Sequence, residues 1–182
     1  MSPRRVLPIF LIVATAAAQR RTPDVPYVPS TEEAVDGMLK LAAVKKTDIV
    51  YDLGCGDGRI VIAAARNYGA HAVGIDIDPE RISEANENAK RAGVEALVRF
   101  EENDLFQADI HEASVVTLFL LSSVNRRLEP KLRRDLKPGS RIVSNTFSMG
   151  NWQADKQFTV GGSAGPLEFS KHLYLWIVPP RK

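Results

Sequence analysis

The stretch Ile49-Val-Tyr-Asp-Leu-Gly-Cys-Gly-Asp-Gly-Arg-Ile60 decides the fold of this 182-residue chain. Its apolar first part predicts a buried β-strand, and the apolar run that follows residue 60 predicts a helix. Three glycines lie between them, where residues without side chains allow the backbone to turn tightly and to approach a ligand. The stretch therefore predicts a strand, a ligand-binding turn and a helix, as found in open α/β sheets.

The spacing of acid and glycines in this turn separates two kinds of ligand. A dinucleotide-binding turn reads Gly-x-Gly-x-x-Gly, whereas here every second residue is glycine and residue 59 is arginine. A carboxylate two residues before the first glycine suits a cationic amine and would repel a pyrophosphate. The pattern resembles motif I of the class I S-adenosylmethionine-dependent methyltransferases, which implies that cofactor. The residues of the motif expected to bind it are Asp52, Gly54, Cys55, Gly56 and Gly58.

Two further carboxylates follow predicted strands. Asp76 ends a short apolar strand 24 residues after Asp52, near the interval expected for an acid that binds ribose hydroxyls. Asp104 follows a third strand, and the resemblance implies that it meets the adenine amino group while the apolar neighbours Ile77 and Leu105 flank the ring. Asn-Asp is also ordinary turn chemistry, so Asp104 has a second interpretation as a turn residue.

Alternating apolar patterns predict the remaining elements. Helices are expected over residues 31–43, 58–67 and 79–92, and a fourth along Leu128, Leu132 and Leu136. Ser30 and Glu33 predict a capping box for the first helix. Strands are expected over residues 48–53, 72–76, 97–102, 114–121, 140–146, 157–161 and 171–178. The pattern predicts an α/β fold, a Rossmann-like, doubly wound, mostly parallel seven-stranded sheet with a C-terminal antiparallel hairpin. The resemblance implies the strand order 3-2-1-4-5-7-6.

Residues 1–18 and residues 19–29 differ in composition. Residues 1–18 combine two arginines, an apolar run and three alanines, which predicts a signal peptide or membrane anchor; a start codon upstream of the real one is the alternative. Residues 19–29, with three prolines, predict an extended lead-in to a methyltransferase domain over 30–182. The first segment indicates export or anchoring, whereas the supply of cofactor favours the cytoplasm.

Charge and cysteine content limit the partners. Loss of residues 1–18 removes two arginines and no acid, which lowers the formal charge from +2 to 0, so no bias toward nucleic acid is expected. The single cysteine, Cys55, cannot form an internal disulfide and is expected to pack within the turn. The histidines are scattered and no Cys/His cluster has the spacing of metal ligands, so no metal is expected.

A closer resemblance bears on the substrate. Over about residues 26–152 the chain resembles bacterial relatives of the mitochondrial protein-lysine methyltransferases that act on the ATP synthase c-subunit and the adenine nucleotide translocase. The resemblance rests on Pro26-Tyr-Val-Pro-Ser-Thr31, on the motif with its Asp57-Gly-Arg59 extension, and on Asn151-Trp152. That extension is more distantly similar to the non-SET histone-lysine methyltransferases. The resemblance implies a protein substrate, with membrane proteins included, and methylation of lysine.

The fourth strand argues against one other class of substrate. Its end reads Thr117-Leu-Phe-Leu-Leu-Ser-Ser123 and lacks the Asn/Asp-Pro-Pro-Tyr/Phe sequence typical of nucleobase amine methylation. No nucleic-acid partner is expected. A methyltransferase for a lipid or quinone-like small molecule, and a non-catalytic domain that binds the cofactor, stay open as alternatives.

The reaction makes few demands on catalytic side chains. Methyl transfer from a sulfonium needs alignment and exclusion of water, so no triad is expected and no catalytic residue is assigned. The substrate pocket is expected above the carboxyl ends of the first, fourth and fifth strands. Tyr27 and Trp152 would form aromatic walls for a lysine side chain. Asn125 and Phe147 complete the predicted pocket.

Overall fold

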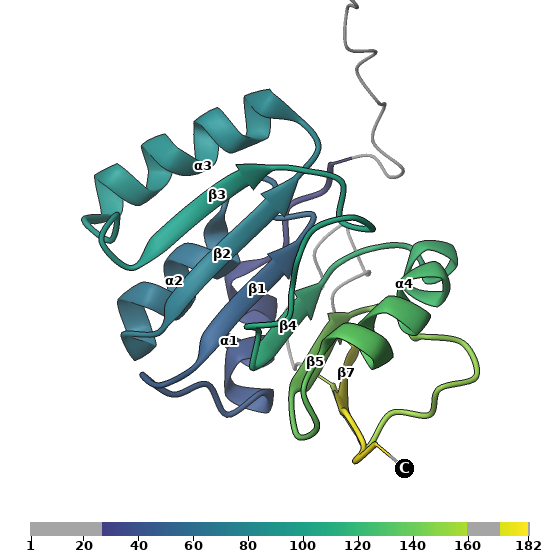
Figure 1. Ribbon diagram of the computed structural model, residues 1–182. Helices are drawn as coiled ribbons and strands as arrows, with labels where there is room; N and C mark the ends of the chain where they lie inside the picture. Colours follow the sequence, from purple (N-terminus) through teal and green to yellow (C-terminus); the bar gives the residue numbers. More distant parts are fainter. Residues whose placement is uncertain (1–26, 160–171, 182) are drawn as a thin grey trace, which may run out of the picture.

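The computed structural model describes residues 27–159 and 172–181 (Figure 1). The predicted signal peptide or anchor, 1–18, lies outside the described residues, as does the lead-in up to residue 26. The same holds for residues 160–161 and 171 of the predicted hairpin. Within the described part, no helix combines the length and apolar character needed to cross a membrane.

Seven strands form one sheet in the order β3-β2-β1-β4-β5-β7-β6. The first five are parallel, whereas β7 runs antiparallel to β5 and to β6, which confirms both the predicted strand order and the C-terminal hairpin. Their bounds are β1 Ile49–Leu53, β2 His71–Asp76, β3 Val98–Glu102, β4 Val115–Leu118, β5 Arg141–Asn145, β6 Lys156–Thr159 and β7 His172–Ile177.

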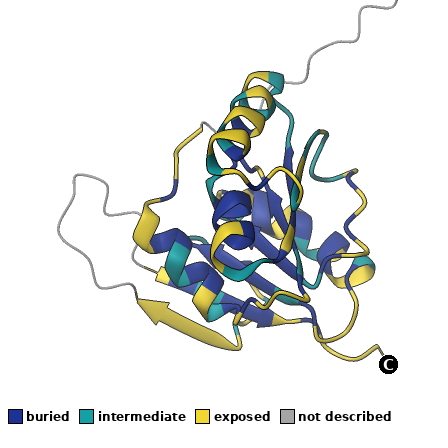
Figure 2. Ribbon diagram, turned by 90° about the vertical axis from the view of Figure 1, so that its left-hand side faces the viewer, coloured by how far each residue is buried: buried dark blue, intermediate teal, exposed yellow. Residues whose placement is uncertain are grey.

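Within residues 27–159 and 172–181, four helices cover the two faces of the sheet. α1 (Glu32–Leu41), α2 (Arg59–Tyr68) and α3 (Pro79–Ala92) lie on one face, and α4 (Ser122–Asp135) lies on the other (Figure 1). Figure 2 shows the central strands buried between these layers, with exposed residues on the outer sides of the helices and along β6. Asp78 caps α3 with Pro79 at its first turn, and Gly93 ends it, so the bounds of this helix agree with the predicted range 79–92.

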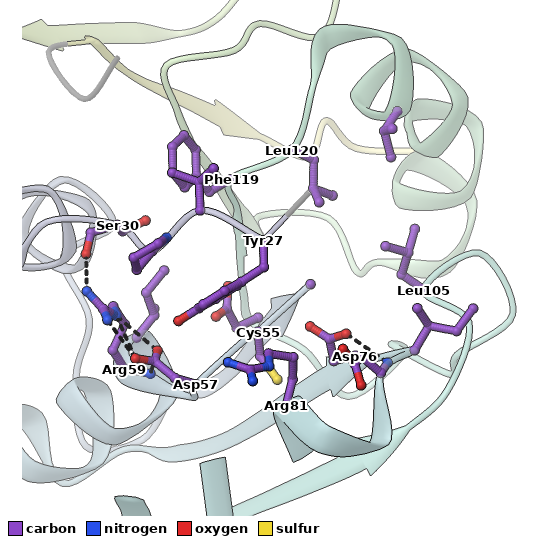
Figure 3. Close-up of a pocket in the computed structure, with 18 of the residues that line it drawn as sticks. Tyr27, Ser30, Cys55, Asp57, Arg59, Asp76, Arg81, Leu105, Phe119 and Leu120 are labelled. Carbon is purple, nitrogen blue, oxygen red and sulfur yellow. Dashed lines mark hydrogen bonds and ion pairs between the residues drawn. The ribbon is translucent and has the colours of Figure 1, made fainter. Parts of the chain in front are cut away.

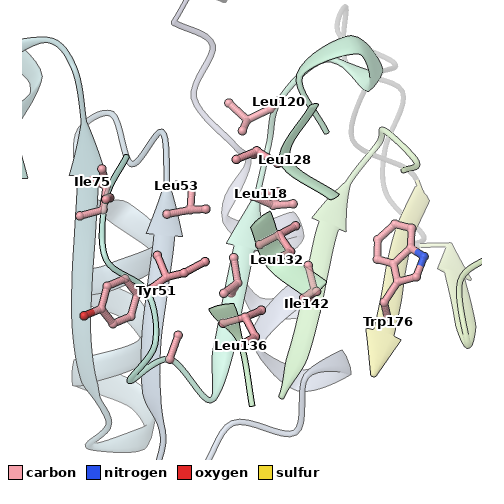
Figure 4. Close-up of a cluster of buried hydrophobic side chains, with 14 of the residues drawn as sticks. Tyr51, Leu53, Ile75, Leu118, Leu120, Leu128, Leu132, Leu136, Ile142 and Trp176 are labelled. Carbon is pink, nitrogen blue, oxygen red and sulfur yellow. The ribbon is translucent and has the colours of Figure 1, made fainter. Parts of the chain in front are cut away.

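The face under α4 holds one continuous apolar cluster among the described residues. Leu128, Leu132 and Leu136 form an apolar stripe that packs on the sheet in the same cluster as Tyr51 and Trp176 (Figure 4). Two irregular segments, between β3 and β4 and between β5 and β6, complete the cover with apolar residues such as Ile110 and Met149. One helix and two loops are therefore enough to bury this face.

The start of α1 differs from the prediction. Thr31 is the N-cap, and its hydroxyl accepts a hydrogen bond from the Ala34 amide at 3.2 Å, so the predicted capping box of Ser30 and Glu33 was wrong. Ser30 is buried instead, and its carbonyl and hydroxyl accept hydrogen bonds from Arg59 and Asn145. The local sequence allows Ser30 to cap the helix, but in the fold Ser30 binds Arg59 and Asn145 instead.

The strand predicted over residues 114–121 ends earlier, at Leu118. Leu118 pairs with Leu53 of β1 and with Ser144 of β5, close to where those neighbouring strands end. Phe119 and Leu120 therefore leave the sheet, although their apolar character alone would continue the strand. This early exit places both side chains at the carboxyl edge of the sheet, where the candidate site lies.

One basic residue of α4 is buried. The side chain of Lys131 is largely covered and forms an ion pair with Asp135 at 2.7 Å. The long aliphatic stem of lysine allows this burial while the ammonium keeps its partner. Lys131 therefore belongs to the buried side of α4.

Candidate cofactor-binding site

A cavity of about 110 Å³ lies at the carboxyl ends of β1, β2 and β4, beneath the described segment that precedes α1. This segment, residues 27–30, is called the N-terminal strap below. Figure 3 shows the strap on one side of the cavity and the glycine turn on the other. Predicted cofactor residues that line the cavity are Asp52, Gly54, Cys55, Asp76, Ile77, Asp104 and Leu105.

Backbone hydrogen bonds hold the glycine turn against β2. The amides of Gly54 and Cys55 both donate to the carbonyl of Ile75, at 2.8 and 2.9 Å. The amide of Gly56 donates to Asp76 Oδ2 at 2.9 Å. The three motif glycines have φ values of +83°, +51° and +80°, in the left-handed region that other residues rarely adopt. The turn is therefore rigid, and its conformation requires glycine.

The three glycines clear space for different neighbours. Gly54 lines the cavity, as a ligand-binding glycine should. A Cβ on Gly56 would come within 2.3 Å of the Tyr27 ring, and a Cβ on Gly58 would come within 2.7 Å of the Phe100 ring. Gly58 thus allows α2 to pack closely on β3 and α3, and its contact with the cofactor stays a prediction.

Asp52 is a buried carboxylate on the floor of the cavity. The Thr117 hydroxyl donates a hydrogen bond to its Oδ1 at 2.7 Å. Burial, with the nearby charges of Asp76 and Asp57, raises the pKa of Asp52 to about 7, although the Thr117 hydrogen bond opposes the shift. A cationic group in the cavity would stabilise the ionised form, which suits the predicted contact with an amine.

Asp76 stands at the end of β2 with both oxygens in use. Its Oδ2 accepts from the Gly56 amide and its Oδ1 accepts from the Asp78 amide at 3.0 Å. Each carboxylate oxygen has two lone pairs, so further hydrogen bonds from two hydroxyl groups can be accepted. The position on the cavity wall and this remaining capacity fit the predicted binding of a ribose.

Asp104 and Leu105 form the adjacent wall. Asp104 Oδ1 accepts from the Phe106 amide at 2.9 Å, and Oδ2 accepts from Gln107 Nε2 at 3.0 Å. These bonds confirm the interpretation of Asp104 as a turn residue. Asp104 also lines the cavity with Leu105 and, across from them, Ile77. The contact with an adenine ring stays a prediction, and this placement is compatible with it.

Cys55 is a packing residue of the turn. Its side chain is 5% exposed, and a Cβ on Gly74 of β2 would come within 2.7 Å of its sulfur. Burial and the charges of Asp52 and Asp76 raise the pKa of the thiol far above its usual range. The thiol is therefore protonated and not a nucleophile, in line with its predicted role.

The strap brings Tyr27, one of the predicted pocket residues, directly over the turn. Its ring faces Gly56 and lies 4.9 Å from the Arg81 guanidinium (Figure 3). Burial and the charge of Asp57 raise the pKa of the phenol. Arg81 of α3 lines the cavity and stacks on Tyr27.

Asp57 and Arg59, the polar residues of the motif's extension, are cavity residues that the sequence left without a role. Arg59 Nε and Nη2 donate to Asp57 at 2.9 and 2.6 Å, and Nη1 donates to the Ser30 carbonyl at 2.5 Å. Hydrogen bonds to Arg59 lower the pKa of Asp57 although burial opposes the shift. The motif and the strap, which are separated in sequence, are thus directly bonded.

The ends of β4 and β5 carry a pair of stacked aromatic rings. Phe119 lines the cavity, and Phe147 stacks on it with ring centres 6.2 Å apart. Asn125 Nδ2 donates to the Phe147 carbonyl at 3.0 Å, and Thr146, just before it, has a φ of +66°. Asn125 itself lies behind this wall and not on the cavity, and its Oδ1 is buried with no hydrogen-bond partner among the described residues.

Trp152 lies away from the cavity. Its ring packs at 6.3 Å from the Trp176 ring and under the Arg133 guanidinium at 3.6 Å. Its carbonyl accepts a hydrogen bond from Trp176 Nε1. The structure therefore gives Trp152 a packing role beside β7, which does not support its predicted place as an aromatic wall. Within the described residues, no group of three or more His, Cys, Asp or Glu side chains is arranged to hold a metal ion.

Comparisons with known proteins agree with this geometry. The ANTKMT methyltransferase domain matches residues 52–156. The chain is 46% identical to a protein-lysine N-methyltransferase of Saccharolobus islandicus over 84% of this chain and 94% of that protein. It is 37% identical to the adenine nucleotide translocase lysine N-methyltransferase of Mus musculus, over 74% of this chain and 59% of that protein.

A solved structure with a bound product provides a further match. An RNA methyltransferase from Salinibacter ruber, in complex with S-adenosyl-L-homocysteine, is 50% identical and superposes with a TM-score of 0.79. The match covers 85% of this chain and 96% of that one. The acids at the ends of β1 and β2 and the open glycine turn fit the same kind of cofactor here. The chain belongs to the ANTKMT methyltransferase domain family and is an S-adenosylmethionine-dependent methyltransferase.

Proposed function

We propose that this enzyme methylates the side-chain amine of a lysine in a protein substrate. The names of the relatives from Saccharolobus islandicus and Mus musculus support a lysine substrate. The observation that carries the proposal is the stacked pair of Phe119 and Phe147, which borders the cofactor cavity at the ends of β4 and β5. An aliphatic chain that ends in an amine suits such an aromatic wall.

The aromatic wall also suits the chemistry. S-adenosylmethionine supplies a methyl group on a positively charged sulfur, so the reaction needs a neutral nucleophile in line with the carbon–sulfur bond. The lysine ammonium first loses a proton to solvent. Its nitrogen lone pair then accepts the methyl group, while the sulfur keeps the electron pair of the broken bond. Phe119 and Phe147 exclude water from the amine, and this desolvation lowers the amine pKa and favours its neutral form.

The rim of the site favours a large substrate. Val28, which lines the cavity, is 44% exposed, and Leu121, next to the lining residue Leu120, is 42% exposed, so apolar side chains face solvent at the rim. Leu121 is already the N-cap of α4, so no inserted segment covers the site at this point of the described chain. A protein surface would bury these residues when its lysine enters. A small lipid or quinone-like substrate would leave them exposed to water.

The proposal is tested with the full chain, radiolabelled S-adenosylmethionine and an extract of the organism that encodes it. We expect label in material that protease digestion removes, and methyl-lysine after acid hydrolysis. The Salinibacter ruber relative makes RNA the main competing result, so a second sample is treated with ribonuclease. Label lost to ribonuclease, or extracted into organic solvent, would contradict a protein substrate.

A matched pair of variants connects the result to the aromatic wall. Phe147→Ala is expected to lower methylation of protein while leaving the affinity for S-adenosylhomocysteine unchanged, because Phe147 lies outside the cavity lining. Phe158→Ala is the control, since Phe158 is 54% exposed on β6, at the far edge of the sheet. Equal activity in both variants would remove Phe147 from the substrate site.

A further inference from the structure

We propose that Tyr27 and Arg59 position the cofactor through the N-terminal strap: Arg59 fastens the strap, and Tyr27 closes the cavity over the glycine turn. On this proposal the cofactor enters and leaves only when the Tyr27 ring swings away. The proposal concerns cofactor binding alone and does not depend on the identity of the methylated substrate. It assigns a role to the Asp57-Gly58-Arg59 extension of the motif.

The Arg59 guanidinium connects three parts of the fold. One side of it forms a paired contact with the Asp57 carboxylate, and Nη1 binds the Ser30 carbonyl. The Asp57 carbonyl accepts a hydrogen bond from Asn88 Nδ2 of α3 at 2.8 Å. Paired arginine–carboxylate contacts fix orientation as well as distance. The strap is therefore fastened through Arg59 to the glycine turn. The glycine turn is itself bound to α3 through Asn88.

The two described ends of the strap differ in exposure. Ser30 is 4% exposed and also receives a hydrogen bond from Asn145 at the end of β5. Tyr27, three residues earlier, is 46% exposed. Its ring is held by the Arg81 guanidinium and by contact with the turn at Gly56. Such an arrangement allows Tyr27 to move while Ser30 stays in place.

The Tyr27 ring takes up part of the space at the glycine turn. The enclosed volume is about 110 Å³. Pockets that bury organic ligands usually have about 300–1,000 Å³. The Tyr27 ring lies over the turn whose acid and glycines form the cofactor site, and it is close enough to Gly56 to exclude any side chain there. The Tyr27 ring therefore narrows the cavity, and the cofactor needs this ring to shift outward in order to enter.

The closed ring has a consequence for the reaction. Once the cofactor is bound, a ring that returns over it would keep water from the site and slow its release. The Tyr27 phenol lies beside Asp57, a member of the pair that fastens the strap; burial and then the charge of Asp57 raise the phenol pKa. Arg59 is thus a positioning residue, because it acts on the cofactor through Tyr27.

The test measures association and dissociation rates of S-adenosylhomocysteine on the immobilised full chain by surface plasmon resonance. Tyr27→Ala is expected to increase both rates, each by about tenfold or more, because the ring no longer has to open. Tyr27→Phe should stay within about twofold of the original chain, since it keeps the ring and its stacking on Arg81. Tyr27 is half exposed, so these variants are expected to fold.

Arg59→Gln extends the test to the fastening of the strap. We expect a dissociation rate about tenfold faster than that of the original chain, with an unchanged circular dichroism spectrum. The matched control is Arg66→Gln on the same helix, because Arg66 is exposed and its guanidinium donates to the neighbouring Asn67 side chain, away from the strap. Unchanged rates in Tyr27→Ala would overturn the proposal. A faster dissociation with an unchanged association rate would also overturn it. That result would mean that the Tyr27 ring contacts the bound cofactor but does not have to move before the cofactor enters.

Discussion

Replacement of Asp52 with asparagine is expected to stabilise the cofactor-free protein and to abolish its tight binding of the cofactor. Asp52 is 3% exposed, and its carboxylate accepts a hydrogen bond from the Thr117 hydroxyl. Burial destabilises the ionised form of this carboxyl group as long as no cationic ligand is bound. Asparagine keeps the acceptor oxygen for Thr117 and removes the charge, so the fold loses a destabilising group while the ligand loses its counter-ion.

The size of the effect follows from the pKa of Asp52, which is raised from 3.8 to about 7. Each pKa unit is worth about 1.4 kcal/mol, so the ionised carboxylate lowers the free energy of unfolding by up to about 4 kcal/mol. Because the folded-state pKa is raised, this loss is absent below about pH 4 and grows until about pH 7. The free energy of unfolding of the variant should therefore exceed that of the original chain most clearly above neutral pH.

Denaturant unfolding of both chains at about pH 4.5, 6 and 8 measures this difference. Asp48→Asn is the matched control, because Asp48 is also buried but its pKa is shifted the other way. Burial raises that pKa, yet hydrogen bonds from Ser114, the Lys45 amide and Arg141 together bring it below its usual value. The control variant should therefore lose stability above about pH 4.

A constant difference between Asp52→Asn and the original chain at all three pH values would refute the reasoning. It would mean that the Asp52 carboxylate ionises as easily in the folded chain as in the unfolded one. Loss of stability in both aspartate variants would contradict it as well, because the pKa values of Asp52 and Asp48 are shifted in opposite directions.

Three further predictions concern the same turn. Cofactor affinity should fall by about tenfold per pH unit below about pH 7, as Asp52 becomes neutral; equal affinities by isothermal titration at about pH 5.5 and 7 would exclude this. Asp76→Ala should weaken binding by about 1–3 kcal/mol, because hydroxyl groups lose their acceptors; an unchanged Kd for the folded variant would remove Asp76 from the site. Gly58→Ala should lower the Tm more than Gly93→Ala, since both have positive φ but only a Cβ at Gly58 meets Phe100; equal losses would contradict close packing as the cause.

The sheet and the cofactor acids were predictable because their causes are local. A strand of apolar residues that ends in an acid fixes the position of the carboxylate once neighbouring strands run in parallel. Asp52 and Asp76 follow this rule, and both line the cavity. The glycine turn is equally local, because φ values in the left-handed region depend on the residue itself.

Contacts between segments that are distant in the sequence were harder to predict. Arg81 falls on the polar side of α3 by helical period, yet its guanidinium extends along the cavity to Tyr27. Ser30 and Thr31 are both good caps, and the structure uses Thr31 because Ser30 is already bound to Arg59 and Asn145. In each case a partner from another segment decides between options that the local sequence leaves equal.

The predictions for aromatic residues also agree with the structure at some positions and not at others. Tyr27 and Phe147 lie at or beside the cavity, whereas Trp152 packs on Trp176 beneath Arg133. An aromatic residue after a strand is compatible with a pocket wall or with a core. Phe119, in contrast, was missed because an apolar run does not indicate where a strand ends; the ends of its neighbours determine that.

The position of the single cysteine makes the turn observable in solution. Cys55 lies between two motif glycines, is 5% exposed, packs on Gly74 and lines the cavity, so a thiol reagent reaches it through the cavity or when the turn leaves β2. With one cysteine in the whole chain, the labelling rate has a single origin. A ligand that fills the cavity or holds the turn in place will slow this labelling. The labelling rate of Cys55 therefore measures access to the cofactor site.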